Sequence, residues 1–169
     1  RPQVERRDFA KEWILPSRGK GILIEEQATN LVPNGLLDNY PSISEPPTGW
    51  VKLADSVTCE RVPARRFGQY ASLITVPATS GGSYRGLRSE HFPVIEGDVY
   101  NFQLGFEHVS GVKRFRPIIR WYDSQMNNLG FDGTYVDVTD GYVVYQLSAT
   151  APQGAVFARV EQRAYELQD

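Results

Sequence analysis

Two stretches of this chain alternate apolar and polar side chains with a period of two, and this pattern constrains the fold more than any other feature. In residues 99–109 (VYNFQLGFEHV), every second side chain from Tyr100 to Phe106 is large and apolar. Residues 115–123 (FRPIIRWYD) alternate in a similar way around Trp121. Successive side chains of a β-strand point to opposite faces, so both stretches predict strands with one buried and one outer face.

The segments between the strand-like runs indicate the fold class. They are short and rich in Gly, Asn and Asp: TSGGS, IEGD, VSGVK, SQMNNLG, DVTDG and APQGA. Short strands joined by such turns are typical of an all-β protein built as an antiparallel β-sandwich. A length of 169 residues with 41% hydrophobic side chains suits one domain with its own core. No helical period of useful length follows residue 20.

Residues 1–20 differ from the rest because they are dense in charge. Phe9, Trp13 and Ile14 recur there at near-helical spacing before a break of Pro and Gly. We therefore predict a short N-terminal arm or helix, followed by one domain over residues 21–169. An apolar stripe on a tether often docks on a neighbour, so the arm leaves a homo-oligomer open. The chain begins with Arg, and we expect it to be a piece of a larger protein.

Composition argues against several classes of protein. The formal net charge of −2 does not suit a general nucleic-acid binder, which needs a strongly basic surface. Cys59 is the only cysteine, so the chain has no internal disulfide and no multi-cysteine zinc site. No apolar run reaches membrane-spanning length, and we predict no membrane insertion.

Four ordered segments resemble one known family. They are NLVPNGLLDN followed by GW, SEHFPVIEGDVYNFQLGF, PIIRWYDSQMNNLG and YQLSATAPQGAVFARV. Over roughly residues 30–163, this series resembles carbohydrate-binding modules of families 4 and 9. The resemblance implies a galactose-binding-like jelly roll that binds a polysaccharide or cell-surface glycan. A second stretch, GILIEEQATNLVPNG, resembles phage tail and tail-fibre proteins, which implies an extracellular or virion-tail location.

The same family implies a structural calcium, and here the sequence departs from the pattern. Family members usually continue into a last strand with an Asp that helps to hold the ion, whereas this chain stops at YELQD. Glu25 and Asp38 could supply oxygen ligands of the kind that calcium takes. We therefore expect no required cofactor and leave a structural calcium open.

Alternation also selects the candidate ligand-binding residues. If Trp121 faces the core, its neighbours on the strand face outward, as do the polar positions of the other strands. The loops add two tyrosines beside Gly clusters. The predicted ligand-binding residues are Arg116, Arg120, Tyr122, Gln103, Glu107, Arg159, Tyr84 and Tyr135.

These residues have a functional and an ordinary interpretation. Should their strands share one sheet, they form an Arg-rich outer face with some aromatics, which suits an anionic or heavily hydroxylated sugar. The same side chains could instead be a solvated sheet face, on which Glu107 and Glu161 neutralise Arg116 and Arg159. Trp50 is expected in the core.

Three functions follow from this. We predict a non-catalytic glycan-binding module, recognising host-surface polysaccharide on a phage tail. The first alternative is a structural or oligomerisation module of a tail or surface assembly. The second is a jelly-roll enzyme that cleaves polysaccharide, for which the carboxylates are scattered singly. His91 and His108 lack the spacing of a metal site or triad, and we expect structural roles for them.

Overall fold

The computed structural model describes most of the chain from residue 30 onward and one short segment near the N-terminus. The described residues are 3–6, 30–64, 69–77, 85–111, 114–137 and 141–165. They form β-strands and contain no helix. Accordingly, no described segment has the helical length and apolar character needed to cross a membrane.

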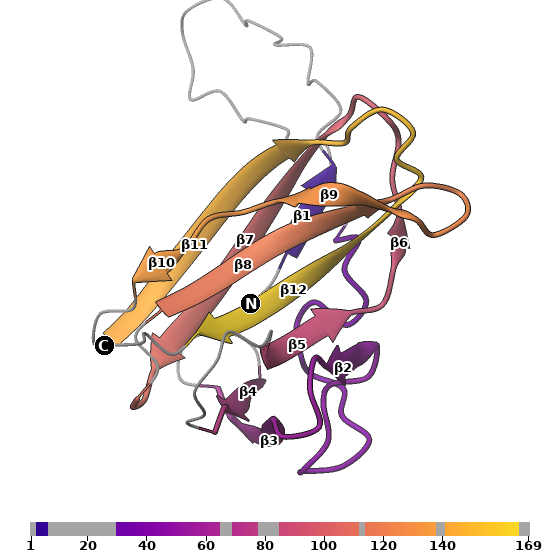
Figure 1. Cartoon of the computed structure of the whole chain (residues 1–169). Helices are drawn as coiled ribbons and strands as arrows, with labels where there is room; N and C mark the ends of the chain where they lie inside the picture. Colours follow the sequence, from indigo (N-terminus) through magenta and orange to yellow (C-terminus); the bar gives the residue numbers. More distant parts are fainter. Residues whose placement is uncertain are drawn as a thin grey trace, which may run out of the picture.

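The long strands run alongside one another, and a small hairpin lies at one end of them (Figure 1). In chain order the strands are β1 (Gln3–Arg6), β2 (Trp50–Lys52), β3 (Thr58–Pro63), β4 (Tyr70–Thr75), β5 (Arg85–Ser89), β6 (Phe92–Pro93), β7 (Val99–His108), β8 (Arg114–Tyr122), β9 (Asn128–Asp132), β10 (Val136–Asp137), β11 (Gly141–Thr150) and β12 (Phe157–Tyr165).

Two antiparallel sheets make the sandwich. The first has the order β1-β7-β11. The second has seven strands: its main path is β10-β8-β12-β5-β2, β9 extends it beside β8, and β6 extends it beside β12. β3 and β4 pair separately as the hairpin. Because β8 and β12 pair along nine residues, their side chains stand in register across the middle of the second sheet.

The core lies between the two sheets and follows the period of two. Tyr100, Phe102 and Leu104 of β7 are buried on its inner face, as the alternation predicts. Trp121 of β8 meets them from the other sheet, with 5.9 Å between its ring centroid and that of Tyr100. Trp50 is buried as expected. The all-β sandwich predicted from the sequence is therefore confirmed.

One glycine sets how closely two strands of the second sheet approach. Gly86 of β5 lies opposite Arg163 of β12, with φ of +138°. A Cβ at this position would lie 1.8 Å from the carbonyl oxygen of Gln162. Only glycine allows this backbone conformation and this close approach of β5 to β12, which lie side by side in the second sheet.

One strand boundary expected from the sequence was wrong, and the predicted N-terminal arm lies mostly outside the described residues. The segment SQMNNLG was read as a turn, but its last residues begin β9, so this boundary was wrong. β9 pairs with β8 and adds an edge to the second sheet. Of the predicted N-terminal arm, only Gln3–Arg6 is described, and it forms a strand at the edge of β7. The other arm residues lie outside the described part, so the arm and the domain boundary at residue 21 stay predictions.

A core substitution should be costly, whereas a neighbouring surface one should not. We expect Phe102→Ala to lower the free energy of unfolding by about 3–5 kcal/mol, because it removes a ring that is 1% exposed. Val109, just after the same strand, is 72% exposed, and Val109→Ala should change that energy by less than about 0.5 kcal/mol. Urea denaturation of the unsubstituted protein and of the two variants measures both changes in the free energy of unfolding. Equal effects would contradict the assigned core.

Candidate functional site

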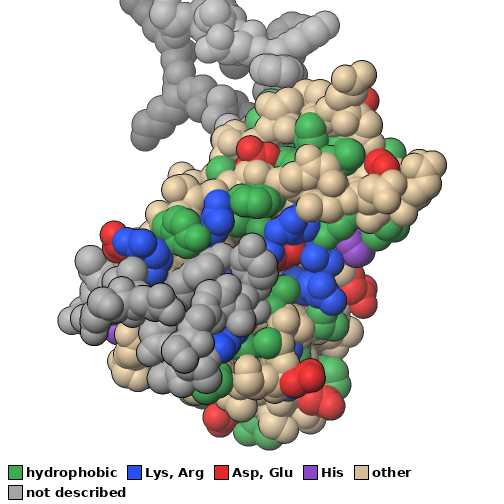
Figure 2. All heavy atoms as spheres, viewed as in Figure 1, with side chains coloured by type: hydrophobic (Ala, Val, Ile, Leu, Met, Phe, Trp, Pro, Cys, Tyr) green, Lys and Arg blue, Asp and Glu red, His purple; other side chains and the backbone are tan. Residues whose placement is uncertain are grey.

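The outer face of the second sheet gathers arginine side chains from three adjacent strands. β8 and β12 pair residue for residue, so their outward positions lie side by side, and β5 continues the row. Figure 2 shows Lys and Arg side chains clustered across the middle of this surface, with a His at its right-hand border. We call this surface the arginine face, and define it by Arg88, Arg116, Arg120, Tyr122, Arg159, Glu161 and Arg163.

Glu161 is the centre of the arginine face. Its side chain is 0% exposed and lies between those of three arginines. Oε1 accepts hydrogen bonds from Nε of Arg120 at 3.0 Å and from Nε of Arg159 at 2.9 Å. Oε2 accepts one from Nε of Arg163 at 2.8 Å and a second from Nη2 of the same residue. Both carboxylate oxygens are therefore fully engaged, and three guanidinium groups are fixed around one point.

The surrounding charges determine the protonation of Glu161. Burial alone would raise the pKa of this carboxyl group, because burial disfavours the charged form. The positive charges of Arg163, Arg120 and Arg159 outweigh that effect and hold the pKa below its usual range. Glu161 is thus an anion at neutral pH. A general acid needs the opposite shift, so Glu161 is unsuited to that role.

Two aromatic side chains from the edge of the sheet cover one end of the arginine face. The ring centroids of Phe131 and Tyr135 each lie 4.6 Å from Cζ of Arg116. Phe131 also lies 5.2 Å from Cζ of Arg120, its neighbour in the β8–β9 register. Phe131 is 40% exposed and Tyr135 46% exposed, so both rings meet solvent while cations hold them from below.

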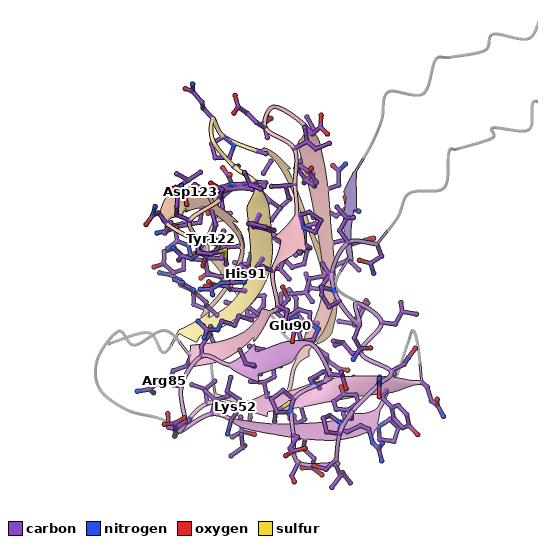
Figure 3. The ribbon with its side chains drawn as sticks, turned by 90° about the vertical axis from the view of Figure 1, so that its right-hand side faces the viewer. Lys52, Arg85, Glu90, His91, Tyr122 and Asp123 are labelled. Atoms are coloured by element: carbon purple, nitrogen blue, oxygen red, sulfur yellow. The ribbon has the colours of Figure 1, made fainter. Side chains whose placement is uncertain are left out.

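A histidine and a tyrosine border the other end. The rings of His91 and Tyr122 meet edge to face, 4.7 Å between centroids, and Figure 3 shows them side by side. Cζ of Arg159 lies 5.1 Å from the Tyr122 ring. Burial lowers the pKa of His91, and the charges of Arg159 and Arg88 lower it further. His91 is therefore neutral at pH 7.

This arrangement combines the two elements of a sugar site. Exposed flat rings stack on the apolar side of a sugar, and guanidinium groups donate hydrogen bonds to hydroxyl or carboxylate oxygens. Glu161 holds Arg120, Arg159 and Arg163 in place, and Arg116 and Arg120 lie against the exposed rings. A site whose groups are already in place loses less freedom on binding.

The structure brings together five of the eight predicted ligand-binding residues. Arg116, Arg120, Tyr122 and Arg159 share the arginine face, and Tyr135 lies at its edge. Two of the other three, Gln103 and Glu107, do not join them. Gln103 and Glu107 lie on β7, in the first sheet, so the condition that all these strands share one sheet is not met for these two. Tyr84 lies outside the described residues.

The expected exposure of the face was also partly wrong. Tyr122 points away from the core, as alternation requires, but it is only 7% exposed. The side chain of Arg120 is 13% exposed. Both are enclosed by neighbours on their own face, which a period of two does not reveal. Glu161 does neutralise Arg159, as one interpretation expected, but Glu107 is on the other sheet and Arg116 has no ion pair with Glu161.

Sequence reasoning missed Phe131, His91 and Arg88 as members of this surface. Phe131 was missed because residues 128–130, which begin its strand, were predicted as the end of a turn. Arg88 and His91 were not linked to β12, because the pairing of β5 with β12 joins residues more than 70 positions apart in the chain. A search for strands of alternating Arg and Glu would have found only the β12 part of the cluster.

The described residues give no support to a metal site. Within them, no three His, Cys, Asp or Glu side chains are grouped closely enough to hold an ion. Oδ1 of Asp38 accepts a hydrogen bond from the backbone N–H of Gln69 at 3.1 Å. Glu25 lies outside the described residues, so the calcium site stays a prediction.

Comparison with known proteins identifies the fold but no sequence family. No family model matches this chain, and no curated protein matches it significantly in sequence. Among solved structures, the enzymatically active domain of tailspike protein 4 of bacteriophage CBA120 is similar, with a TM-score of 0.58 and 18% identity. The match covers 71% of this chain and 18% of that one.

Two structures from Clostridium thermocellum endo-1,4-β-D-xylanase 10B are also similar. Its CBM22-1–GH10 modules, in complex with xylohexaose, give a TM-score of 0.54 at 16% identity, covering 70% of this chain and 23% of that one. Its C-terminal family 22 carbohydrate-binding module gives 0.52 at 13% identity, covering 70% and 77%. This chain thus spans less than a quarter of the first two structures. At such identities the likeness shows the fold alone, a β-sandwich like those of carbohydrate-binding modules. The resemblance to families 4 and 9 stays a prediction.

Removing the charge of Glu161 should destabilise the protein strongly. We expect Glu161→Gln to lower the free energy of unfolding by about 3–5 kcal/mol, because three enclosed guanidinium groups lose their counter-charge. Glu60 on β3 is exposed, and Glu60→Gln should cost less than about 0.5 kcal/mol. Urea denaturation at pH 7 compares the two variants. If the Glu161 variant were as stable as the Glu60 variant, the ion pairs of Glu161 would contribute nothing to the free energy of unfolding.

The same carboxylate should make stability depend on acidity. Its pKa is lower in the folded than in the unfolded chain, so the unfolded chain takes up more protons. The stability that it contributes is complete above the unfolded pKa of about 4.3, and is lost as the pH falls through the lower folded pKa. Below about pH 5, the urea concentration at the midpoint of unfolding should fall with decreasing pH in both proteins. It should fall less steeply for Glu161→Gln than for the unsubstituted protein. Parallel curves would contradict this.

Proposed function

We propose that this protein is a non-catalytic glycan-binding module and that the arginine face, with Phe131 and Tyr135, is its binding surface. The observation that carries the proposal is the pair of exposed rings that lie against Arg116 and Arg120. The guanidinium groups of the arginine face lie next to these rings and can donate hydrogen bonds to a sugar. The β-sandwich fold, which carbohydrate-binding modules share, supports it as well.

Binding without catalysis agrees with the chemistry of this surface. A glycosidase needs two carboxyl groups that face each other across the sugar, one of them an acid with a raised pKa. On the arginine face the enclosed carboxylate is Glu161, whose oxygens are engaged by three arginines and whose pKa is lowered. These constraints favour a fixed scaffold for binding over a proton donor.

We place the module outside the cell or on a virion tail, where it recognises host-surface polysaccharide. Two observations support this part of the proposal. Residues 21–35 resemble phage tail and tail-fibre segments. One structure of similar fold belongs to a phage tailspike.

Substituting either exposed ring should weaken glycan binding without unfolding the protein. After a glycan array has identified a ligand, we expect Phe131→Ala and Tyr135→Ala each to lower the affinity by about tenfold or more, since each removes a stacking surface. Calorimetric titration measures the affinity, and circular dichroism checks the fold.

Val144→Ala is the matched control, because Val144 is 45% exposed on β11 of the opposite sheet. It should bind like the unsubstituted protein. Failure of every array glycan to bind would refute the function. Binding that survives both ring substitutions would keep the function but move the site elsewhere.

A further inference from the structure

The charges on the arginine face are unbalanced within the described residues. Three of its arginines bind Glu161, the one carboxylate among the residues that define the face. The remaining two, Arg88 and Arg116, make no ion pair or hydrogen bond with any described acidic side chain. Arginine side chains held in a partly enclosed place without a counter-charge favour an anion that comes from outside the chain.

Arg116 is the better fixed of these two cations. Its guanidinium lies 4.6 Å from each of two ring centroids, those of Phe131 and Tyr135. Its Nε atom is buried and has no hydrogen-bond partner. Aromatic contacts hold the planar group in place but satisfy none of its donors strongly. A planar, pre-oriented guanidinium matches the paired oxygens of a carboxylate or a similar anionic group.

Arg88 lies across the face from Arg116. It stands opposite Glu161 on β12, whereas Arg116 stands opposite Arg163, and β12 lies between their two strands. Strand spacing and rise put their Cα atoms about 12 Å apart. Two cations on residues at this separation suit a chain that carries repeated negative charges better than one small anion.

The effect of the excess positive charge is visible at the border of the face. After burial, the charges of Arg159 and Arg88 are the next causes that lower the pKa of His91. The carboxylate of Glu161 acts in the opposite direction, but it does not compensate for them. At His91, the charges of Arg159 and Arg88 therefore outweigh the charge of Glu161.

We infer that the glycan bound here is an acidic polysaccharide, whose anionic groups bind Arg116 and Arg88 while its sugar rings stack on Phe131 and Tyr135. This inference rests on the proposed function and narrows it to a substrate class. The shared chemistry is an anionic group with paired oxygens, carboxylate or sulfate, repeated along a sugar chain.

Calorimetric titration with matched acidic and neutral glycans tests this inference. The pairs are oligogalacturonate with its methyl ester, alginate with its methyl ester, and dextran sulfate with dextran. We expect the acidic member of at least one pair to bind about tenfold tighter or more than its neutral partner. Only the acidic member carries anionic groups that can pair with the two arginines. Tighter binding of the acidic member in either carboxylate pair would identify the recognised group as a carboxylate. Tighter binding in the sulfate pair would identify it as a sulfate.

Charge-matched variants locate the effect. Arg116→Gln and Arg88→Gln should each lower the affinity for the acidic ligand about tenfold or more, by the loss of a charged hydrogen bond. Arg61→Gln changes the net charge equally but lies on β3, where Arg61 packs on Tyr70, and it should leave binding unchanged. The pKa of His91, followed by NMR, should rise when the acidic ligand binds and stay constant with the neutral one.

Several results would overturn the inference. Equal binding of the acidic and neutral members would do so, as would equal losses in the Arg61 and Arg116 variants. If neutral array glycans bind and no acidic glycan does, the proposed function stands and the acidic specificity fails. If no glycan of either kind binds, the proposed function fails, and this inference with it.

Discussion

The contact of Glu161 with three arginines is the interaction on which the outer surface of this protein depends. A carboxylate without solvent exposure is tolerable only when it is paired, and Arg120, Arg159 and Arg163 supply more positive charge than it needs. The carboxylate in turn offsets part of the repulsion among these arginines, which lie close together in a chain with a net charge of −2. The cluster thus organises the outer surface, whereas the fold itself is held by the apolar core beneath.

The rest of the site is built on that cluster. Arg120, fixed by Glu161, lies against Phe131, and Arg116 lies against Phe131 and Tyr135. Phe131 on the edge strand β9 and Tyr135, which comes just before β10, therefore lie over the cations, and the pairing of β5 with β12 adds Arg88 on the other side. Residues from four parts of the chain converge because the second sheet is antiparallel throughout and its pairings are long-range.

The fold could be predicted from the sequence because a period of two is a local signal. The alternation around Phe102 and Trp121 identified the inner face of both sheets correctly. What the pattern could not show is which strands become neighbours, so Gln103 and Glu107 were grouped with arginines that lie on the other sheet. Alternation also does not show whether side chains on the outer face are exposed or are covered by their neighbours on that face. Tyr122, which is on the outer face but buried, is an example. Both properties depend on contacts between distant residues, which a single sequence does not record.

The most direct test of the account is a map of where a glycan touches the protein. Amide resonances of the isotope-labelled protein, followed by NMR during titration with a glycan identified on the array, report this without any substitution. We predict that the largest shifts occur in β8, β9 and β12 and around His91. Largest shifts in β7 and β11, on the opposite sheet, would contradict the assignment of the arginine face as the binding surface.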